Sequence, residues 1–130
     1  MYVRLLAAVA VTVSAMLHLK MWFDGVRDQS VGPAFMVNAI GGVVIAVLLL
    51  TWDHWVPAFL TLGFGLSTLG AFIISTTVGL MGVHSHWEGF AVYAAAVSEV
   101  VCIVVGAMLL LASRTHRTLA GSRAPGRRVA

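Results

Sequence analysis

Charged residues are scarce in this chain. Only 10% of its 130 residues are Asp, Glu, Lys or Arg, whereas 60% are hydrophobic. Soluble globular domains are about one quarter charged. A soluble domain of this size cannot bury so much apolar surface, so lipid must cover the remainder. The composition therefore excludes a soluble globular fold and indicates an integral membrane protein.

Cysteine is almost absent as well. The single cysteine, Cys102, lies inside a long hydrophobic stretch, which excludes a disulfide framework and a zinc ribbon.

The chain also lacks a catalytic-triad motif and a phosphate-binding loop. One buried glutamate and one buried histidine are too few functional groups to specify a reaction class, so the sequence does not predict an enzyme.

Long hydrophobic stretches dominate the sequence instead. They cover about residues 3–23, 34–52, 57–80 and 91–111, and each is long enough to cross a bilayer as a helix. The connections between them are short, which favours an up-down-up-down topology. We therefore predict an all-α, polytopic membrane protein in which residues 1–113 form an antiparallel four-helix transmembrane bundle.

The positive residues predict the orientation of the bundle. Arg4 lies near the N-terminus and five arginines lie in residues 114–130, whereas the opposite side has only Lys20 and Arg27. Positive residues concentrate on the cytoplasmic side of a membrane, so both termini should be cytoplasmic in a multi-pass protein of the cell membrane. Residues 114–130 are predicted to be a basic flexible tail that contacts anionic lipid headgroups, with no nucleic acid as partner.

A carboxylate lies near the middle of the fourth hydrophobic stretch. An ionisable group inside a membrane span is costly, so Glu99 is a functional candidate. Its helical face carries the small residues Ala95, Cys102 and Gly106. Transmembrane helices present small residues to one another. We therefore expect Glu99 to face the interior of the bundle.

Small residues also recur at four-residue spacing in the other stretches, together with polar residues at similar depth. The clearest series is Gly63, Ser67, Ala71, Ser75 and Gly79. With a rise of ~1.5 Å per residue, the polar residues fall roughly 6 to 12 Å inside the external ends of their helices. We predict an outward-facing polar pocket lined by His18, Asn38, Ser75, Thr76, Thr77 and Glu99. The alternative is that Asn38 and Ser75 only join neighbouring helices through hydrogen bonds.

Histidine and methionine gather near the predicted external surface. Imidazole and thioether ligands together suit copper, and methionine favours Cu(I). The candidate metal ligands are His84, His86, His18 and Met21. The alternative is that methionine only fills apolar space and that His84-Ser85-His86 is a solvated turn. Haem is not expected, because one buried histidine does not suffice for bis-histidine ligation.

Two resemblances bear on the fold. The segment from Arg4 to the pair His18-Leu19 resembles the first helix of DoxX-like four-helix membrane proteins. In size and number of spans, the chain is also similar to small multidrug resistance transporters, which carry a membrane-buried glutamate in their first helix. Here the buried glutamate is Glu99 in the fourth span, so no residue role is transferred and the sequence assigns the chain to neither family.

Three functional hypotheses follow. The first is an accessory or interaction subunit of a larger membrane complex, with a pocket that holds a lipid or quinone. Its partners would be the lipid bilayer and either other membrane subunits or further copies of the chain. The second is a small proton-coupled transporter that uses Glu99. The third is external binding of copper or another metal. The absence of catalytic motifs and of a large extramembrane region favours the first.

Overall fold

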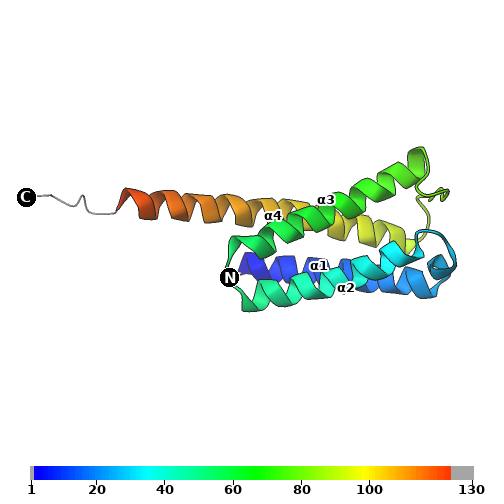
Figure 1. Ribbon diagram of the computed structural model, residues 1–130, viewed down its shortest axis with the longest axis horizontal. Coiled ribbons are helices and arrows are strands. Elements are labelled where there is room, and N and C mark those ends of the chain that lie inside the picture. Colours follow the sequence, from blue (N-terminus) through cyan, green and yellow to red (C-terminus); the bar gives the residue numbers. More distant parts are fainter. Residues whose placement is uncertain (1, 124–130) are drawn as a thin grey trace, which may run out of the picture.

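The computed structural model describes residues 2–123, which form four long helices joined by short connections (Figure 1). Within these residues, all four helices are long and apolar enough to cross a membrane. The prediction of an all-α fold with four helices suited to a multi-pass membrane protein is therefore confirmed. The helices are α1 (Tyr2–Phe23), α2 (Gly32–Thr51), α3 (Trp55–Thr77) and α4 (Phe90–Ser122), and a short 3₁₀ helix, η1 (Val26–Asp28), precedes α2.

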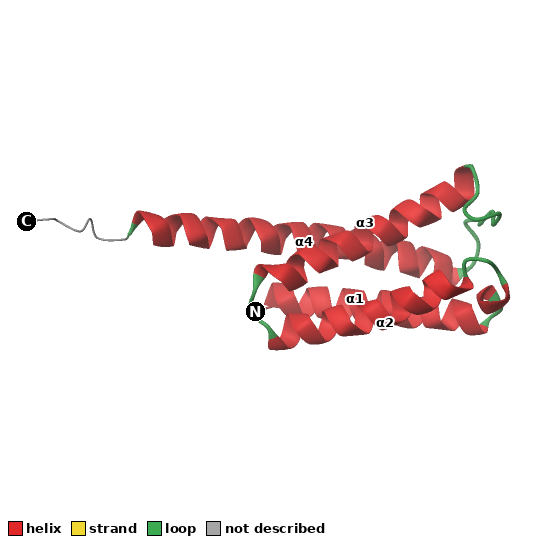
Figure 2. Ribbon diagram, in the orientation of Figure 1, coloured by secondary structure: helices red, strands yellow, loops and turns green. Residues whose placement is uncertain are grey.

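The connections lie at two ends of the bundle. The η1 connection and the loop of residues 78–89 lie together at one end, which we call the η1 end (Figure 2). A hydrogen bond of 2.6 Å from Ser30 Oγ to the carbonyl oxygen of Met81 joins these two connections. The start of α1 and the turn between α2 and α3 lie at the opposite end (Figure 1).

Arg4 joins the start of α1 to the end of α2 through hydrogen bonds. Its guanidinium donates to the carbonyl oxygens of Leu49 (3.0 Å), His54 (3.4 Å) and Trp52, and lies 3.8 Å from Asp53 Oδ1. The last carbonyls of a helix have no partner within the helix. Arg4 therefore satisfies the end of α2 and fixes the α2–α3 turn at the same time.

We expect Arg4→Ala to lower the free energy of unfolding by about 1 to 2 kcal/mol, because the carbonyls lose a charged donor. Arg4→Lys should recover only part of the loss, since an ammonium group lacks the planar fork of donors. Unfolding of the purified protein by sodium dodecyl sulfate, followed by circular dichroism, measures the change. Arg114→Ala, at an exposed arginine of α4, is the control. An equal loss in that variant would contradict the role given to Arg4.

Three glycines mediate close contacts between helices. A Cβ atom on Gly42 would lie 2.7 Å from Ala15 Cβ, and one on Gly65 would lie 2.7 Å from the carbonyl oxygen of Glu99. A Cβ atom on Gly106 would lie 2.7 Å from the backbone nitrogen of Leu62. These glycines let α1 approach α2, and α3 approach α4, at backbone distance.

The small-residue series that begins at Gly63 does not mediate these contacts. A Cβ atom on Gly63 would meet nothing within 4 Å. Gly63, Ser67, Ala71 and Ser75 instead border a cavity between α2 and α3.

The fourth helix continues past the end of its predicted span. The hydrophobic stretch ends near Leu111, but α4 extends to Ser122, and residues 115–123 are exposed. Hydropathy reports where lipid contact ends, whereas a helix ends where its hydrogen bonding stops or a residue such as proline prevents it. Part of the predicted tail is thus helical, and its remaining residues, 124–130, lie outside the described residues.

Candidate functional site

A cavity of about 760 Å³ separates α2 from α3. In Figure 1, α3 tilts away from α2 toward the η1 end of the bundle. The cavity extends along α3 from Phe59 to Ser75, and its walls are largely apolar, with Ile45 and Phe64 among them. Its volume is in the range of sites that bind small molecules.

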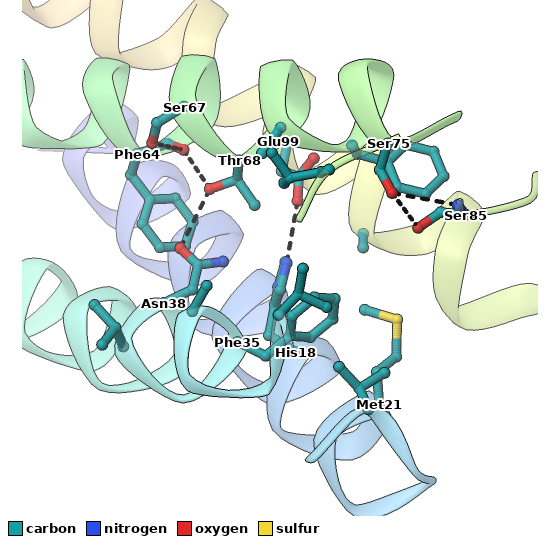
Figure 3. A pocket seen from close by; sticks show the side chains of 18 of the residues that line it. His18, Met21, Phe35, Asn38, Phe64, Ser67, Thr68, Ser75, Ser85 and Glu99 are labelled. Carbon is teal, nitrogen blue, oxygen red and sulfur yellow. Dashed lines mark hydrogen bonds and ion pairs between the residues drawn. The ribbon is translucent and has the colours of Figure 1, made fainter. Parts of the chain in front are cut away.

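His18 of α1 and Glu99 of α4 form the polar part of this cavity. Both side chains are buried, with 5% and 3% of their residue surface exposed. His18 Nε2 lies 3.6 Å from Glu99 Oε1 (Figure 3). Glu99 faces the interior of the bundle, as the small residues around it predict.

The hydrogen bonding of His18 fixes where its proton lies. His18 Nδ1 is 2.7 Å from the carbonyl oxygen of Ser14, which can only accept, so Nδ1 carries a hydrogen. Nε2 is therefore the nitrogen that faces Glu99. Two arrangements suit this geometry: a carboxylic acid facing a neutral imidazole, or a carboxylate facing an imidazolium. In both arrangements the pair carries one proton, either on the carboxyl group of Glu99 or on Nε2 of His18.

Asn38 of α2 contributes an amide with one unused group. Thr68 Oγ1 of α3 lies 3.2 Å from Asn38 Oδ1 and 2.6 Å from the carbonyl oxygen of Phe64. Asn38 Nδ2 is buried and has no hydrogen-bond partner among residues 2–123. In Figure 3 this nitrogen points toward the His18–Glu99 pair. An unsatisfied buried donor costs about 1 to 3 kcal/mol, so a polar atom of a ligand would be stabilised there.

Thr68 was not among the residues predicted to line the pocket. A threonine in a membrane helix usually bonds to its own backbone, and Thr68 does so at Phe64. Thr68 belongs to the site because it lies opposite Asn38. The sequence does not show this position. The available signal was that Thr68 directly follows Ser67 of the small-residue series.

Ser75 borders the cavity, but its hydroxyl group is occupied by the loop of residues 78–89. It donates to the carbonyl oxygen of Val83 at 3.0 Å and lies 2.8 Å from Ser85 Oγ. The structure places Thr76 and Thr77 away from the cavity, where their hydroxyl groups bond to the carbonyl oxygen of Ile73 at 3.0 and 2.9 Å. Of the predicted pocket residues, the structure thus brings together His18, Asn38, Ser75 and Glu99 around the cavity.

The predicted metal ligands also border the cavity. They are His18, Met21, His84 and His86. Within residues 2–123, however, no three His, Cys, Asp or Glu side chains lie close enough together to hold a metal ion. The imidazole of His84 packs against Gly79, where a Cβ atom would lie 2.7 Å from Nε2. The structure therefore offers no assembled ligand set of that kind in this part of the chain.

The arrangement combines an apolar cavity with hydrogen-bonding groups at one position. His18, Glu99 and Asn38 come from three different helices, so their placement depends on the packing of the whole bundle (Figure 3). Such a site suits a molecule with an apolar body and a polar head that exchanges hydrogen bonds. No protein-family model, curated protein or solved structure matches this chain.

Proposed function

We propose that this protein is an accessory subunit of a larger membrane complex and that the cavity between α2 and α3 holds a lipid-soluble ligand, a quinone or a lipid. One observation carries the proposal: the cavity is apolar along α2 and α3 and polar where Asn38 approaches the His18–Glu99 pair. A head group would lie at these residues, and a chain would lie along the apolar walls.

The proposal includes an orientation in the membrane. The four helices would cross the cell membrane in antiparallel fashion with both termini cytoplasmic, since six of the eight basic residues are close to the termini in the sequence and positive residues concentrate on the cytoplasmic side. The η1 end would then face outward, and the polar part of the cavity would lie in the outer half of the bilayer. Reporter fusions at the two termini and at the loop of residues 78–89 test this orientation.

Apolar helix faces would mediate the contact with partner subunits. A groove between α1 and α4 is lined by apolar side chains, among them Leu6, Val9, Phe90 and Val97, and it offers such a face to lipid or to another subunit. Native mass spectrometry from nanodiscs measures stoichiometry, co-purifying subunits and retained ligand together. A monomer that retains neither a subunit nor a ligand would contradict the accessory role.

Filling the cavity tests the ligand site. We expect Gly63→Leu to weaken binding of decylubiquinone by about tenfold or more, because the added side chain enters the space that the ligand needs. Trp87 packs edge-on against Phe72 of the cavity wall, with ring centroids 4.6 Å apart, so quenching of tryptophan fluorescence can report saturable binding.

Gly70→Leu is the matched control for Gly63→Leu. Gly70 also lies inside α3 and a Cβ atom there would meet nothing within 4 Å, but Gly70 does not border the cavity. Gly70→Leu should bind decylubiquinone as tightly as the wild type does. Equal weakening of decylubiquinone binding in both variants would show that leucine acts by disturbing α3 and not by filling the cavity. Absence of saturable binding would exclude the quinone, and lipid retained in native mass spectrometry would then identify the ligand as a lipid.

A second candidate function is proton-coupled transport, and the buried, proton-titratable pair of His18 and Glu99 beside the cavity favours it. The test is pH-dependent transport of ethidium in proteoliposomes. We expect Glu99→Gln to abolish such transport, because an amide cannot release a proton. Transport that is absent from the wild type, or unaffected by Glu99→Gln, would contradict this function.

A further inference from the structure

The hydroxyl group of Thr68 has one proton and two acceptors within reach. Its Oγ1 lies 2.6 Å from the carbonyl oxygen of Phe64 and 3.2 Å from Asn38 Oδ1. One proton cannot fully serve both acceptors. The direction of this single hydrogen bond therefore decides what Asn38 presents to the cavity.

Both directions give a satisfied contact between Thr68 and Asn38. When Thr68 donates to Asn38 Oδ1, the amide NH₂ group is left to donate to a ligand. When Thr68 donates to Phe64, its oxygen becomes an acceptor, and the amide, turned over, donates to it. The amide oxygen of Asn38 is then left to accept from a ligand. Asn38 can thus act as a donor or as an acceptor without losing its partner on α3.

We propose that the Asn38–Thr68 pair lets the cavity bind a quinone in both its oxidised and its reduced state. This inference rests on the proposed ligand site. The carbonyl oxygen of a quinone accepts a hydrogen bond, whereas the hydroxyl group of a quinol also donates one. A fixed donor would favour the quinone and a fixed acceptor would favour the quinol. A pair that reverses its polarity accommodates either head group with the same two residues.

The His18–Glu99 pair can likewise act as a hydrogen-bond donor or as an acceptor. Because Nδ1 of His18 is committed to the carbonyl oxygen of Ser14, a proton shared by the pair resides either on Nε2 or on the carboxyl group of Glu99. Their separation of 3.6 Å is longer than a hydrogen bond, so neither atom is tied to the other. Whichever atom carries the proton can donate to a ligand oxygen, and the other can accept.

The test compares decylubiquinone with decylubiquinol, its reduced form, on the purified protein without oxygen. The two dissociation constants should agree within about threefold. Asn38→Leu should weaken both by about tenfold, because each form loses one hydrogen bond. In the ligand-free protein the Asn38 side chain has one hydrogen bond, to Thr68, and its NH₂ group has none. Replacing it by leucine therefore removes a single hydrogen bond, so the variant should fold.

Two further measurements separate a ligand contact from a structural effect. The carbonyl stretching band of bound decylubiquinone should shift to lower frequency in the wild type and return toward the free value in Asn38→Leu. Thr68→Val should weaken both forms, since the amide loses its anchor, whereas Thr76→Val should change neither. Thr76 is the control because its hydroxyl group bonds to the carbonyl oxygen of Ile73 outside the cavity.

The outcomes are distinguishable. Dissociation constants of the two forms that differ by more than about threefold in the wild type would overturn the reversible anchor and leave the quinone site standing. Affinities unchanged in Asn38→Leu would also overturn it. If neither form binds saturably, the proposed quinone site fails and this inference fails with it.

Discussion

Gly106→Val should lower the free energy of unfolding by about 3 kcal/mol or more, because it places a branched side chain where two backbones meet. A Cβ atom on Gly106 would lie 2.7 Å from the backbone nitrogen of Leu62 and 3.0 Å from its Cα. Backbone atoms cannot rotate aside as the end of a side chain can. The fourth helix must therefore move away from α3, and the contacts along this interface are lost together.

The matched control is Gly70→Val. Gly70 lies inside α3, and a Cβ atom there would meet nothing within 4 Å. Unfolding by sodium dodecyl sulfate, followed by circular dichroism, gives the free energy for both variants. Only Gly106→Val should unfold at a lower detergent fraction. Similar losses would show that valine acts through helix propensity and would contradict the close contact between α3 and α4.

The interface that contains Gly106 also positions Glu99. Gly65 of α3 lies against the backbone of α4 at Glu99, where a Cβ atom would be 2.7 Å from the carbonyl oxygen. A displacement of α4 from α3 would therefore move the carboxyl group relative to His18. We expect Gly106→Val to impair ligand binding as well as stability, although Gly106 does not border the cavity.

Hydropathy was sufficient to predict the four membrane helices, because it depends only on local sequence. The burial of Glu99 followed from the small residues on its own helical face. The choice of packing face on α3 did not follow. Gly63 belongs to the longest small-residue series but borders the cavity, whereas Gly65 lies outside that series and contacts α4. Residue size shows that a close approach is sterically allowed, but it does not show which helix lies opposite.

The polar residues of the site show the same limit. The estimated depth of Ser75 suggested a pocket residue, but its hydroxyl group bonds to the loop of residues 78–89, whose path a helical pattern does not report. The role of Thr68 depends on α2, thirty residues earlier in the chain. The cavity itself arises because α3 diverges from α2, and no periodic pattern in either helix encodes that angle (Figure 1).

His18→Leu should lower the free energy of unfolding by about 3 kcal/mol, because it leaves Glu99 buried without its partner. Replacing both residues, in His18→Leu/Glu99→Leu, should bring the loss to about 1 kcal/mol or less, since neither leucine leaves an unpaired polar group in the bundle. The double variant should thus be more stable than the single variant. A double-mutant cycle from unfolding in sodium dodecyl sulfate measures this coupling.

If the two substitutions lowered the free energy of unfolding independently, the double variant would be less stable than either single variant. That result would contradict the pairing of His18 with Glu99. The double variant also separates stability from function. It should fold nearly as well as the wild type, yet it lacks the imidazole and carboxyl groups of the pair beside the cavity. Decylubiquinone binding should therefore weaken in a protein of near-normal stability. Binding that survives in this variant would leave Asn38 as the group that holds the head of the ligand.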